Sequence, residues 1–364
     1  MDNPRSDLSP RKGRGAISNP AGRFETRDRP LDPGAAPARP RTEVREERAR
    51  KAIARNESPD IPFDRSVNPY RGCEHGCVYC FARPTHSYLG LSPGLDFETI
   101  LTAKTNAAEA LAAELRAPRY RCAPLALGAN TDPYQPIERE CRITRDILET
   151  LAAFRHPFVI ITKSGLVQRD IDVIAPESTA GRAAVLISIT TLDNRLAAAM
   201  EPRASAPAKR IEAISALAAA GVRVGVLAAP VIPAINDHEI EAILEASAAA
   251  GARSAGWVLL RTPYEIEALV AEWMVAHHPH RAARHRSLMA QMRPSQAQKT
   301  DFHKRMRGSG PIAQSYAARF RAACRRLGLE HRAARNGGGA TDAFDLDCSA
   351  FAPPPAPGDQ LTLI

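Results

Sequence analysis

The sequence predicts an α/β fold in which a parallel sheet is open or curls into part of a barrel. Between residues 61 and 272, short apolar runs rich in β-branched residues alternate with longer segments rich in Ala, Leu and Glu. The alternation repeats six times, and strands joined through helices form parallel sheets with right-handed crossovers. In such sheets the active site lies at the carboxyl ends of the strands.

Each expected strand is an apolar run too short for a helix, such as FVIITK or AVLISIT. The six strands are expected at residues 66–70, 123–128, 158–163, 184–190, 222–229 and 254–260. Helices are expected after them at residues 105–116, 143–155, 168–174, 206–220, 237–250 and 263–276. Residues 59–276 therefore form the expected core, a partial barrel of six β/α units.

The segments outside this core differ from it in composition. Residues 1–58 are rich in proline and charge and contain one aromatic residue, Phe24, so we expect a mostly disordered N-terminal tail with a short helix within residues 41–55. Residues 277–335 are expected to form a basic helical extension, and residues 336–364 a flexible tail rich in Gly and Pro.

Positive charge is concentrated in the expected extension. The chain carries a net charge of +9, yet His278 to Arg335 alone holds 14 Lys and Arg against two acids, a local net charge of +12. Ile312, Tyr316, Phe320 and Cys324 recur every four residues there and predict an amphipathic helix whose arginines lie off the apolar stripe. This helix either caps the core with a solvated basic face or binds nucleic-acid phosphates.

Three of the seven cysteines lie within eight positions, as C-x-x-x-C-x-x-C at Cys73, Cys77 and Cys80. Glycines within this loop let three thiolates converge on soft iron or zinc. Zinc requires a fourth ligand, for which His75 and His86 are candidates. A four-iron, four-sulfur cluster would instead leave one iron open for a substrate or cofactor.

The stretch CEHGCVYC resembles the cluster motif of the radical S-adenosylmethionine (SAM) superfamily, including the aromatic Tyr79 before the third cysteine. The resemblance implies the partial (β/α)6 TIM-type barrel of that superfamily and two cofactors, a 4Fe-4S cluster and SAM. It also implies reductive cleavage of SAM to methionine and a 5′-deoxyadenosyl radical, with an electron donor such as flavodoxin or ferredoxin. The competing hypothesis is a non-catalytic zinc or nucleic-acid-binding module.

The resemblance further assigns cofactor contacts to polar residues at the ends of later strands. Lys163 is expected to pair with the methionyl carboxylate, and small residues at the fifth strand end are expected to admit the adenine. The expected SAM-binding residues are Tyr79, Asn130, Thr131, Asp132, Lys163, Ser188, Thr190 and Ala228. His86, Tyr88 and Tyr134 are expected near the same pocket.

The block from Asp60 to Arg332, with TDPYQPIE, APVIPAIND and MRGSG, resembles the spore photoproduct lyase-related branch, and RPTHSYLG marks uncharacterised bacterial members of it. This implies a lyase-like enzyme of DNA repair or modification, with a protein or small-molecule substrate as the alternative. One departure concerns the hydrogen-donating cysteine of the lyase, because Ala129 and Asn130 stand at that position here.

Two further expectations concern partners and location. The segment QLTLI, at Gln360 to Ile364, resembles the short bacterial peptide that docks on the replicative sliding clamp, and the alternative is an amphipathic tail that packs on its own domain. An odd number of cysteines and the lack of an apolar leader predict a cytoplasmic protein. No apolar run approaches the roughly 18 to 20 residues that a membrane span needs.

Overall fold

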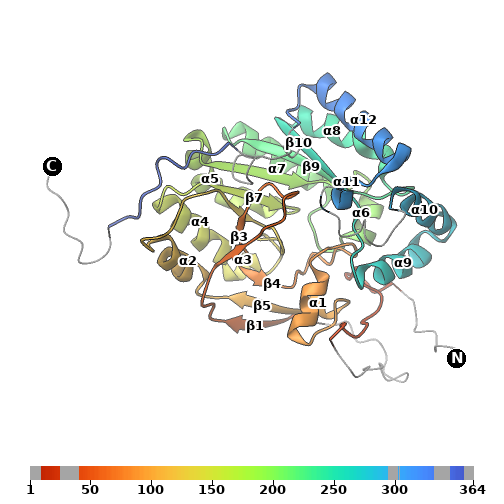
Figure 1. Cartoon of the computed structure of the whole chain (residues 1–364), viewed down its shortest axis with the longest axis horizontal. Coiled ribbons are helices and arrows are strands. Elements are labelled where there is room, and N and C mark those ends of the chain that lie inside the picture. Colours follow the sequence, from red (N-terminus) through yellow and green to blue (C-terminus); the bar gives the residue numbers. More distant parts are fainter. Residues whose placement is uncertain (1–9, 25–40, 294–301, 303, 332–344, 356–364) are drawn as a thin grey trace.

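A computed structural model describes residues 10–24, 41–293, 302, 304–331 and 345–355 of the chain. Its main feature is a seven-stranded sheet in the order β10-β9-β8-β7-β6-β3-β2 (Figure 1). The strands are β2 (Ile53–Arg55), β3 (Arg65–Val67), β6 (Leu125–Leu127), β7 (Phe158–Thr162), β8 (Ala183–Ser188), β9 (Val224–Val231) and β10 (Ser254–Leu259). Every neighbouring pair from β3 to β10 is parallel, and β2 adds an antiparallel strand at the edge.

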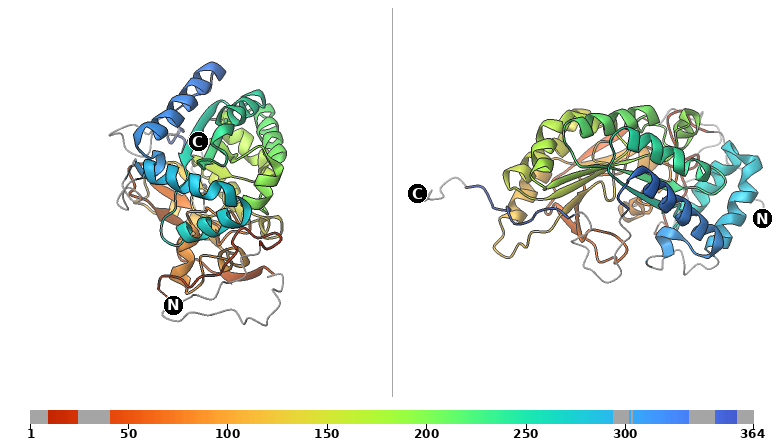
Figure 2. Two further views of the ribbon diagram at one scale, coloured as in Figure 1. Left: turned by 90° about the vertical axis from the view of Figure 1, so that its right-hand side faces the viewer. Right: turned by 90° about the horizontal axis from the view of Figure 1, so that it is seen from above.

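Helices cover one face of this sheet along its whole width (Figure 2). They are α2 (Ala107–Leu115), α4 (Ile143–Ala153), α5 (Ile171–Thr179), α7 (Pro207–Ala219) and α8 (Ile240–Ala249), with short 3₁₀ turns η2 (Gly165–Asp170) and η3 (Asp237–Glu239). Consecutive residues Phe158, Val159 and Ile160 of β7 are fully buried, so both faces of the sheet are covered. The expected partial barrel of six β/α units is confirmed.

A second, three-stranded sheet contains part of the N-terminal segment. Its order is β1-β5-β4, formed by Glu43–Glu47, Ile100–Lys104 and Tyr70–Arg71, and it lies below the large sheet in Figure 1, beside α1 (Asp96–Thr99). The disorder expected for residues 1–58 is therefore wrong for residues 10–24 and 41–58, and residues 41–55 form β1 and β2 rather than a helix. Composition misleads here because β1 gains its order by pairing with β5 rather than by burying apolar side chains. Residues 1–9 and 25–40 lie outside the described part.

The basic extension is helical where the structure describes it. It contains α10 (Pro279–Met292), α11 (Lys304–Arg307) and α12 (Gly310–Leu327), after α9 (Ile266–His277). The stripe of Tyr316, Phe320 and Cys324 is buried in the main core. Arg319 forms two hydrogen bonds with Glu241 of α8, at 2.6 and 2.7 Å, and Arg326 pairs with Glu245. The helix α12 is thus a cap on the core, and part of its positive charge is neutralised by α8.

Residues 345–355 pack on the opposite end of the sheet from the strand ends that carry the site. The ring of Phe351 lies 5.3 Å from that of His156 and 5.5 Å from that of Tyr120. The N–H of Asp347 donates to the carbonyl of Gly181 at 3.0 Å. The expectation of a flexible tail is wrong for these residues, because an aromatic side chain anchors them. The candidate clamp peptide, Gln360 to Ile364, lies outside the described residues.

Among the described residues, no helix is long and apolar enough to cross a membrane.

Candidate active site

The cysteine loop follows β4 and is held by backbone hydrogen bonds at both ends. The N–H of Cys73 donates to Phe97 at 2.9 Å, and the N–H of Val78 donates to Met200 at 3.1 Å. Gly76 has a φ of 66°, and a Cβ there would lie 2.8 Å from a carboxylate oxygen of Glu98. The loop therefore turns tightly against its support, which only glycine allows.

The three thiols of this loop are free, and those of Cys73 and Cys77 are buried. Burial, followed by nearby negative groups, raises the pKa of both thiols well above the ordinary value, and burial also raises that of Cys80. Negative charge on Cys77 or Cys80 would raise the pKa of Cys73 further, and charge on Cys80 that of Cys77, so the three thiols lie near one another. Thiolates in this place require a strongly cationic partner, and an iron–sulfur cluster that takes one thiolate per iron fits them. In the described residues, no three His, Cys, Asp or Glu side chains form a ready-made site for one metal ion.

A fully buried ion pair supports the loop from below. The guanidinium of Arg83, in the 3₁₀ helix η1 (Arg83–Leu89), donates to the carbonyl of Cys77 at 2.8 Å and to that of Gly76 at 3.2 Å. It also pairs with Glu98 of α1, and neither side chain is exposed. Removing one partner of such a pair leaves an unpaired charge in the interior, so both residues fix the loop.

The N-terminal segment binds the same carboxylate. The N–H groups of Gly15 and Ala16 donate to Glu98 at 3.0 and 2.8 Å, and Arg14 donates to the Glu98 carbonyl at 2.8 Å. A Cβ on Gly15 would lie 1.8 Å from the carbonyl oxygen of Gly76. Residues 14–16 thus form part of the wall behind the cysteine loop.

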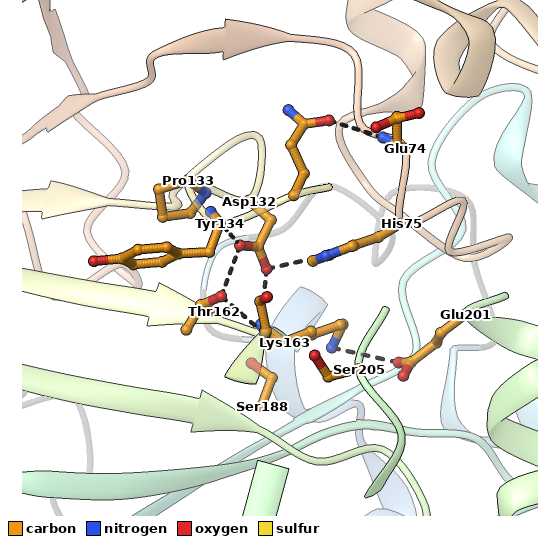
Figure 3. Close-up of polar contacts among 12 residues, drawn as sticks. Glu74, His75, Asp132, Pro133, Tyr134, Thr162, Lys163, Ser188, Glu201 and Ser205 are labelled. Atoms are coloured by element: carbon orange, nitrogen blue, oxygen red, sulfur yellow. Dashed lines mark hydrogen bonds and ion pairs between the residues drawn. The ribbon is translucent and has the colours of Figure 1, made fainter. Parts of the chain in front are cut away.

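Asp132, after β6, links the cysteine loop to the end of β7 (Figure 3). One oxygen accepts hydrogen bonds from Thr162 at 2.7 Å and from the N–H of Tyr134 at 2.9 Å. The other accepts from the N–H of Lys163 at 2.7 Å and lies 3.3 Å from Nδ1 of His75. Burial alone would raise the pKa of Asp132, but the charge of His75 and these hydrogen bonds hold it below its ordinary value.

A second polar group joins β7, β8 and β9 beside the loop. The hydroxyl of Tyr79 donates to Glu201, which is fully buried and paired with Arg210 of α7. Thr190 donates to the same carboxylate at 2.5 Å. The Nζ of Lys163 lies 3.5 Å from Glu201 (Figure 3), and burial lowers the pKa of Lys163 to about 8. Lys163 contacts Glu201 at a longer distance than Arg210 does. Of the two cations, Lys163 is therefore the more available to bind another anion.

The remaining predicted SAM-binding residues lie at the same end of the sheet. Ser188 ends β8, near Lys163 in Figure 3, and Ala228 of β9 is buried beside Trp257. Thr131 is buried and donates to the carbonyl of Tyr70 at 3.0 Å, and the N–H of Asn130 donates to Asn68. The structure therefore gathers these residues at one edge of the sheet, with Thr131 and Asp132 already bonded within the protein.

Other site residues could not be identified from the sequence. Gln135 is fully buried, accepts from the N–H of Glu74 at 2.8 Å and donates to the carbonyl of Gly72 at 3.2 Å. Arg83, Glu98 and Arg210 are equally hidden. The only sequence signal for such residues is a charged residue between apolar ones, as in PAKRIEAI for Arg210. This signal does not identify a buried residue, because charged residues are normally exposed.

The aromatic residues near the loop differ in position. Tyr134 is buried and donates to Asp170 at 3.0 Å, and its ring points away from Lys163 (Figure 3). Tyr88 is 70% exposed. His86 is buried with Nε2 3.0 Å from the carbonyl of Ile100, and its Nδ1 has no partner among the described residues.

Comparison with known proteins agrees with this architecture. Residues 67–246 match the model of the Radical SAM superfamily. The uncharacterized protein Rv2578c of Mycobacterium tuberculosis is 39% identical over 230 residues, which are 63% of this chain and 68% of that protein. The uncharacterized protein MJ0683 of Methanocaldococcus jannaschii is 27% identical over 53% of this chain and 69% of its own length.

Solved structures share the fold. Spore photoproduct lyase complexed with dinucleoside spore photoproduct aligns with a TM-score of 0.55 at 14% identity, over 79% of this chain and 81% of the lyase. A mutant of that lyase with bound AdoMet and dinucleoside spore photoproduct aligns with a TM-score of 0.52 at 16% identity, over 79% and 80% of the two chains.

The chain belongs to the radical SAM superfamily and is a radical SAM enzyme. Within it, the protein groups with the relatives that Rv2578c represents and shares the fold of spore photoproduct lyase. Membership implies a 4Fe-4S cluster and SAM, and it favours iron over the zinc module.

Proposed function

We propose that this enzyme generates a 5′-deoxyadenosyl radical that abstracts hydrogen from a nucleic acid, in DNA repair or modification. The observation that carries the proposal is the combination of the buried cysteine loop with exposed aromatic and arginine side chains beside it. When bound and reduced by a donor such as flavodoxin or ferredoxin, the cluster supplies the electron that cleaves SAM. The chain's own residues hold the two cofactors and the substrate.

Cys73, Cys77 and Cys80 are the proposed cluster ligands. Lys163 is the proposed partner of the methionyl carboxylate, since its 3.4 to 3.5 Å contacts with Glu201, Thr190 and the Ala229 carbonyl are longer than those of Arg210 to the same network. Tyr79, Asn130, Ser188, Thr190 and Ala228 line the proposed SAM site. For Thr131 and Asp132 we propose a positioning role instead, because their side chains are already bonded to Tyr70, Thr162 and Lys163.

The nucleic-acid substrate is supported by a group of exposed rings formed by Phe24, Tyr88 and Tyr264. Their exposed fractions are 57%, 70% and 65%, and the guanidinium of Arg23 lies 4.2 to 5.3 Å from the three ring centres. Tyr88 belongs to the helix that follows Cys80. Exposed rings with a neighbouring arginine are the usual means of stacking unpaired bases.

A lyase reaction identical to that of spore photoproduct lyase is not part of this proposal. Ala129 and Asn130 follow β6 where the lyase has its hydrogen donor. Cys141 lies in α3 (Glu138–Cys141), and Cys122 lies before β6, at the end of the sheet that packs on the C-terminal tail. The product radical is therefore quenched by another group or reacts further.

The test is anaerobic. The protein is reconstituted with iron and sulfide, reduced and mixed with SAM, and 5′-deoxyadenosine is measured beside Cys77→Ala and a Cys324→Ala control that removes a buried thiol elsewhere. We expect cofactor cleavage in the wild type and the control, and loss of both iron and cleavage in Cys77→Ala. Reducible, iron-loaded wild-type protein that makes no 5′-deoxyadenosine would refute the radical chemistry.

Substrate class is then tested with damaged and modified DNA and RNA, a peptide library and small metabolites. An increase in 5′-deoxyadenosine formation with an oligonucleotide supports the proposal. An increase with a peptide or small molecule alone would replace it by the corresponding substrate class.

A further inference from the structure

Four arginine residues lie around the carboxyl-terminal part of β10, and one of them, Arg261, is next to Phe81, the residue after Cys80. Arg261 follows β10, Arg293 follows α10, and Arg305 and Arg307 belong to α11. Arg293 donates to the carbonyl of Arg305 at 2.7 Å, and Arg261 lies 3.9 Å from the sulfur of Met306. We call these four residues the arginine group.

Positive charge in the arginine group exceeds the negative charge around it. Arg305 forms two hydrogen bonds with Asp60, at 2.5 and 2.7 Å. Among the described residues, no ion pair joins the other three arginines to a carboxylate, although the charge of Asp60 also acts on Arg261. Arg307 donates to the carbonyl of Trp257 at 2.6 Å, and its guanidinium lies 4.5 Å from the centre of the Trp257 ring. Arg293 is 7% exposed, and the buried Nε atoms of Arg261 and Arg293 have no hydrogen-bond acceptor there.

Such an arrangement is costly in the absence of an anion. Burial lowers the pKa of each of Arg261, Arg293 and Arg307 to about 10, and the charge of Arg305 contributes to the shift at Arg261. A buried cation without a counter-charge destabilises a fold, because backbone carbonyls accept its hydrogen bonds but do not neutralise its charge. Planar guanidinium groups match the oxygen atoms of phosphate in pairs.

Two exposed rings flank the arginine group. Phe81, the residue after Cys80, is 51% exposed and its ring centre lies 5.9 Å from the Arg261 guanidinium. Phe302 is 48% exposed and lies 4.7 Å from that of Arg305. An aromatic face beside an arginine can stack a nucleobase while the arginine binds the backbone.

We propose that the arginine group binds a phosphodiester of the substrate strand and thereby places a nucleotide, stacked on Phe81, beside the cysteine loop. This inference rests on the proposed function and adds to it the group that the enzyme recognises. It also assigns phosphate binding to the arginine group and not to the exposed arginines of α12. A free nucleotide or inorganic phosphate has the same chemistry, so the experiment distinguishes these sources.

The experiment measures binding to reconstituted, SAM-loaded protein by fluorescence anisotropy. The probes are a labelled single-stranded oligonucleotide and its methylphosphonate analogue, which has the same bases but an uncharged backbone. We expect the wild type to bind the phosphodiester at least about tenfold more tightly, as expected for one charge-assisted pair. In Arg261→Gln this preference should fall to about twofold or less, whereas Arg261→Lys should retain part of it.

The matched control is Arg325→Gln, an exposed arginine of α12, which should keep the full preference. Equal affinity of the wild type for both probes, or an unchanged preference in Arg261→Gln, would overturn the proposal. Calorimetric binding of inorganic phosphate or a mononucleotide, without any binding of the oligonucleotide, would also overturn it, in favour of a free anion. A tenfold loss of SAM affinity in Arg261→Gln would assign the residue to the cofactor instead.

Measurement of 5′-deoxyadenosine formation in the absence of nucleic acid distinguishes failure of this inference from failure of the proposed function. If the wild type cleaves SAM but shows no phosphodiester preference, the arginine proposal fails and the radical chemistry stands. If the preference is present but SAM is not cleaved, the binding site stands and the proposed reaction fails.

Discussion

At the scale of single residues, Lys163 has the most specific task that we propose. Its Nζ lies 3.4 to 3.5 Å from three oxygen atoms, whereas Arg210 binds Glu201 at shorter range. Glu201 is therefore neutralised without Lys163, and the ammonium group can pair with another carboxylate. Burial enhances that pairing because water does not compete for the charge.

We predict that Lys163→Gln weakens SAM binding by about tenfold or more, since a hydrogen bond to a charged group contributes about 1.5 to 3 kcal/mol. Equilibrium dialysis of SAM against the reconstituted protein measures the effect. Lys209→Gln removes an exposed lysine of α7 that pairs with Glu212 and should bind SAM normally. Wild-type affinity in Lys163→Gln would show that the carboxylate is bound elsewhere.

The residues around Lys163 also show what a sequence can reveal about a site. Lys163, Ser188 and Thr190 were predictable because carboxyl ends of parallel strands meet at one edge, so polar residues after apolar runs converge. Asp132 lies at the same edge, but only the coordinates show that its oxygens accept hydrogen bonds from Thr162 and Lys163. Hydrogen-bond partners distant in sequence leave no local pattern.

At the scale of elements, the N-terminal segment and the cysteine loop act as one unit. Gly15 packs against the carbonyl of Gly76, and its N–H binds Glu98 beneath the loop. The segment was not predictable from composition, because it is ordered by backbone hydrogen bonds and by a close contact that requires the absence of a side chain.

We predict that Gly15→Ala lowers the free energy of unfolding by about 1 to 3 kcal/mol, the usual cost of overpacking, and reduces the iron retained after reconstitution. The added Cβ would lie 1.8 Å from a backbone oxygen, so the loop must shift. Gly13→Ala is the control, because nothing lies within 4 Å of its Cβ and only its φ of 77° is unfavourable. Iron content and urea unfolding report the two effects, and equal behaviour of both variants would contradict the contact.

The C-terminal segment of residues 345–355 gives a prediction that depends on pH. His156 is fully buried beneath Phe351, with Nε2 2.7 Å from the Tyr120 hydroxyl, and burial lowers its pKa from 6.5 to about 4. As pH falls from 6.5 to 4, the unfolded chain takes up a proton at His156 and the folded chain does not. Stability must therefore fall across this window, by up to about 3 kcal/mol from this group.

We expect His156→Gln to be less stable at pH 7, because packing and a hydrogen bond are lost, but to lose less stability than the wild type between pH 6.5 and 4. Urea unfolding at a series of pH values measures the slope. His280→Gln, at an exposed position of α10, should retain the wild-type slope. A slope in His156→Gln as steep as that of the wild type would refute this assignment.

At the scale of the whole molecule, the sheet was predictable and the location of the unneutralised charge was not. Strands that are joined through helices pair in parallel, because the crossover connections are right-handed. The parallel pairing of β7 with β8 and of β8 with β9 agrees with this expectation. The net charge of the basic extension, in contrast, does not show which arginines are paired. Arg319 and Arg326 find glutamates on α8, from a distant part of the chain.

This distribution predicts the salt dependence of nucleic-acid binding. Arg261, Arg293 and Arg307 have no carboxylate partner in the described part of the chain, and each phosphate of a single strand that is neutralised contributes about −0.7 to the slope of log K against log salt. We therefore expect a slope of about −2 for a short single strand. Arg261→Gln should make it shallower by about 0.7, and the double variant Arg321→Gln and Arg325→Gln on α12 should leave it unchanged. The opposite result, with a shallower slope only in the α12 variant, would place the phosphates along the basic face of that helix and remove the strand from the cysteine loop.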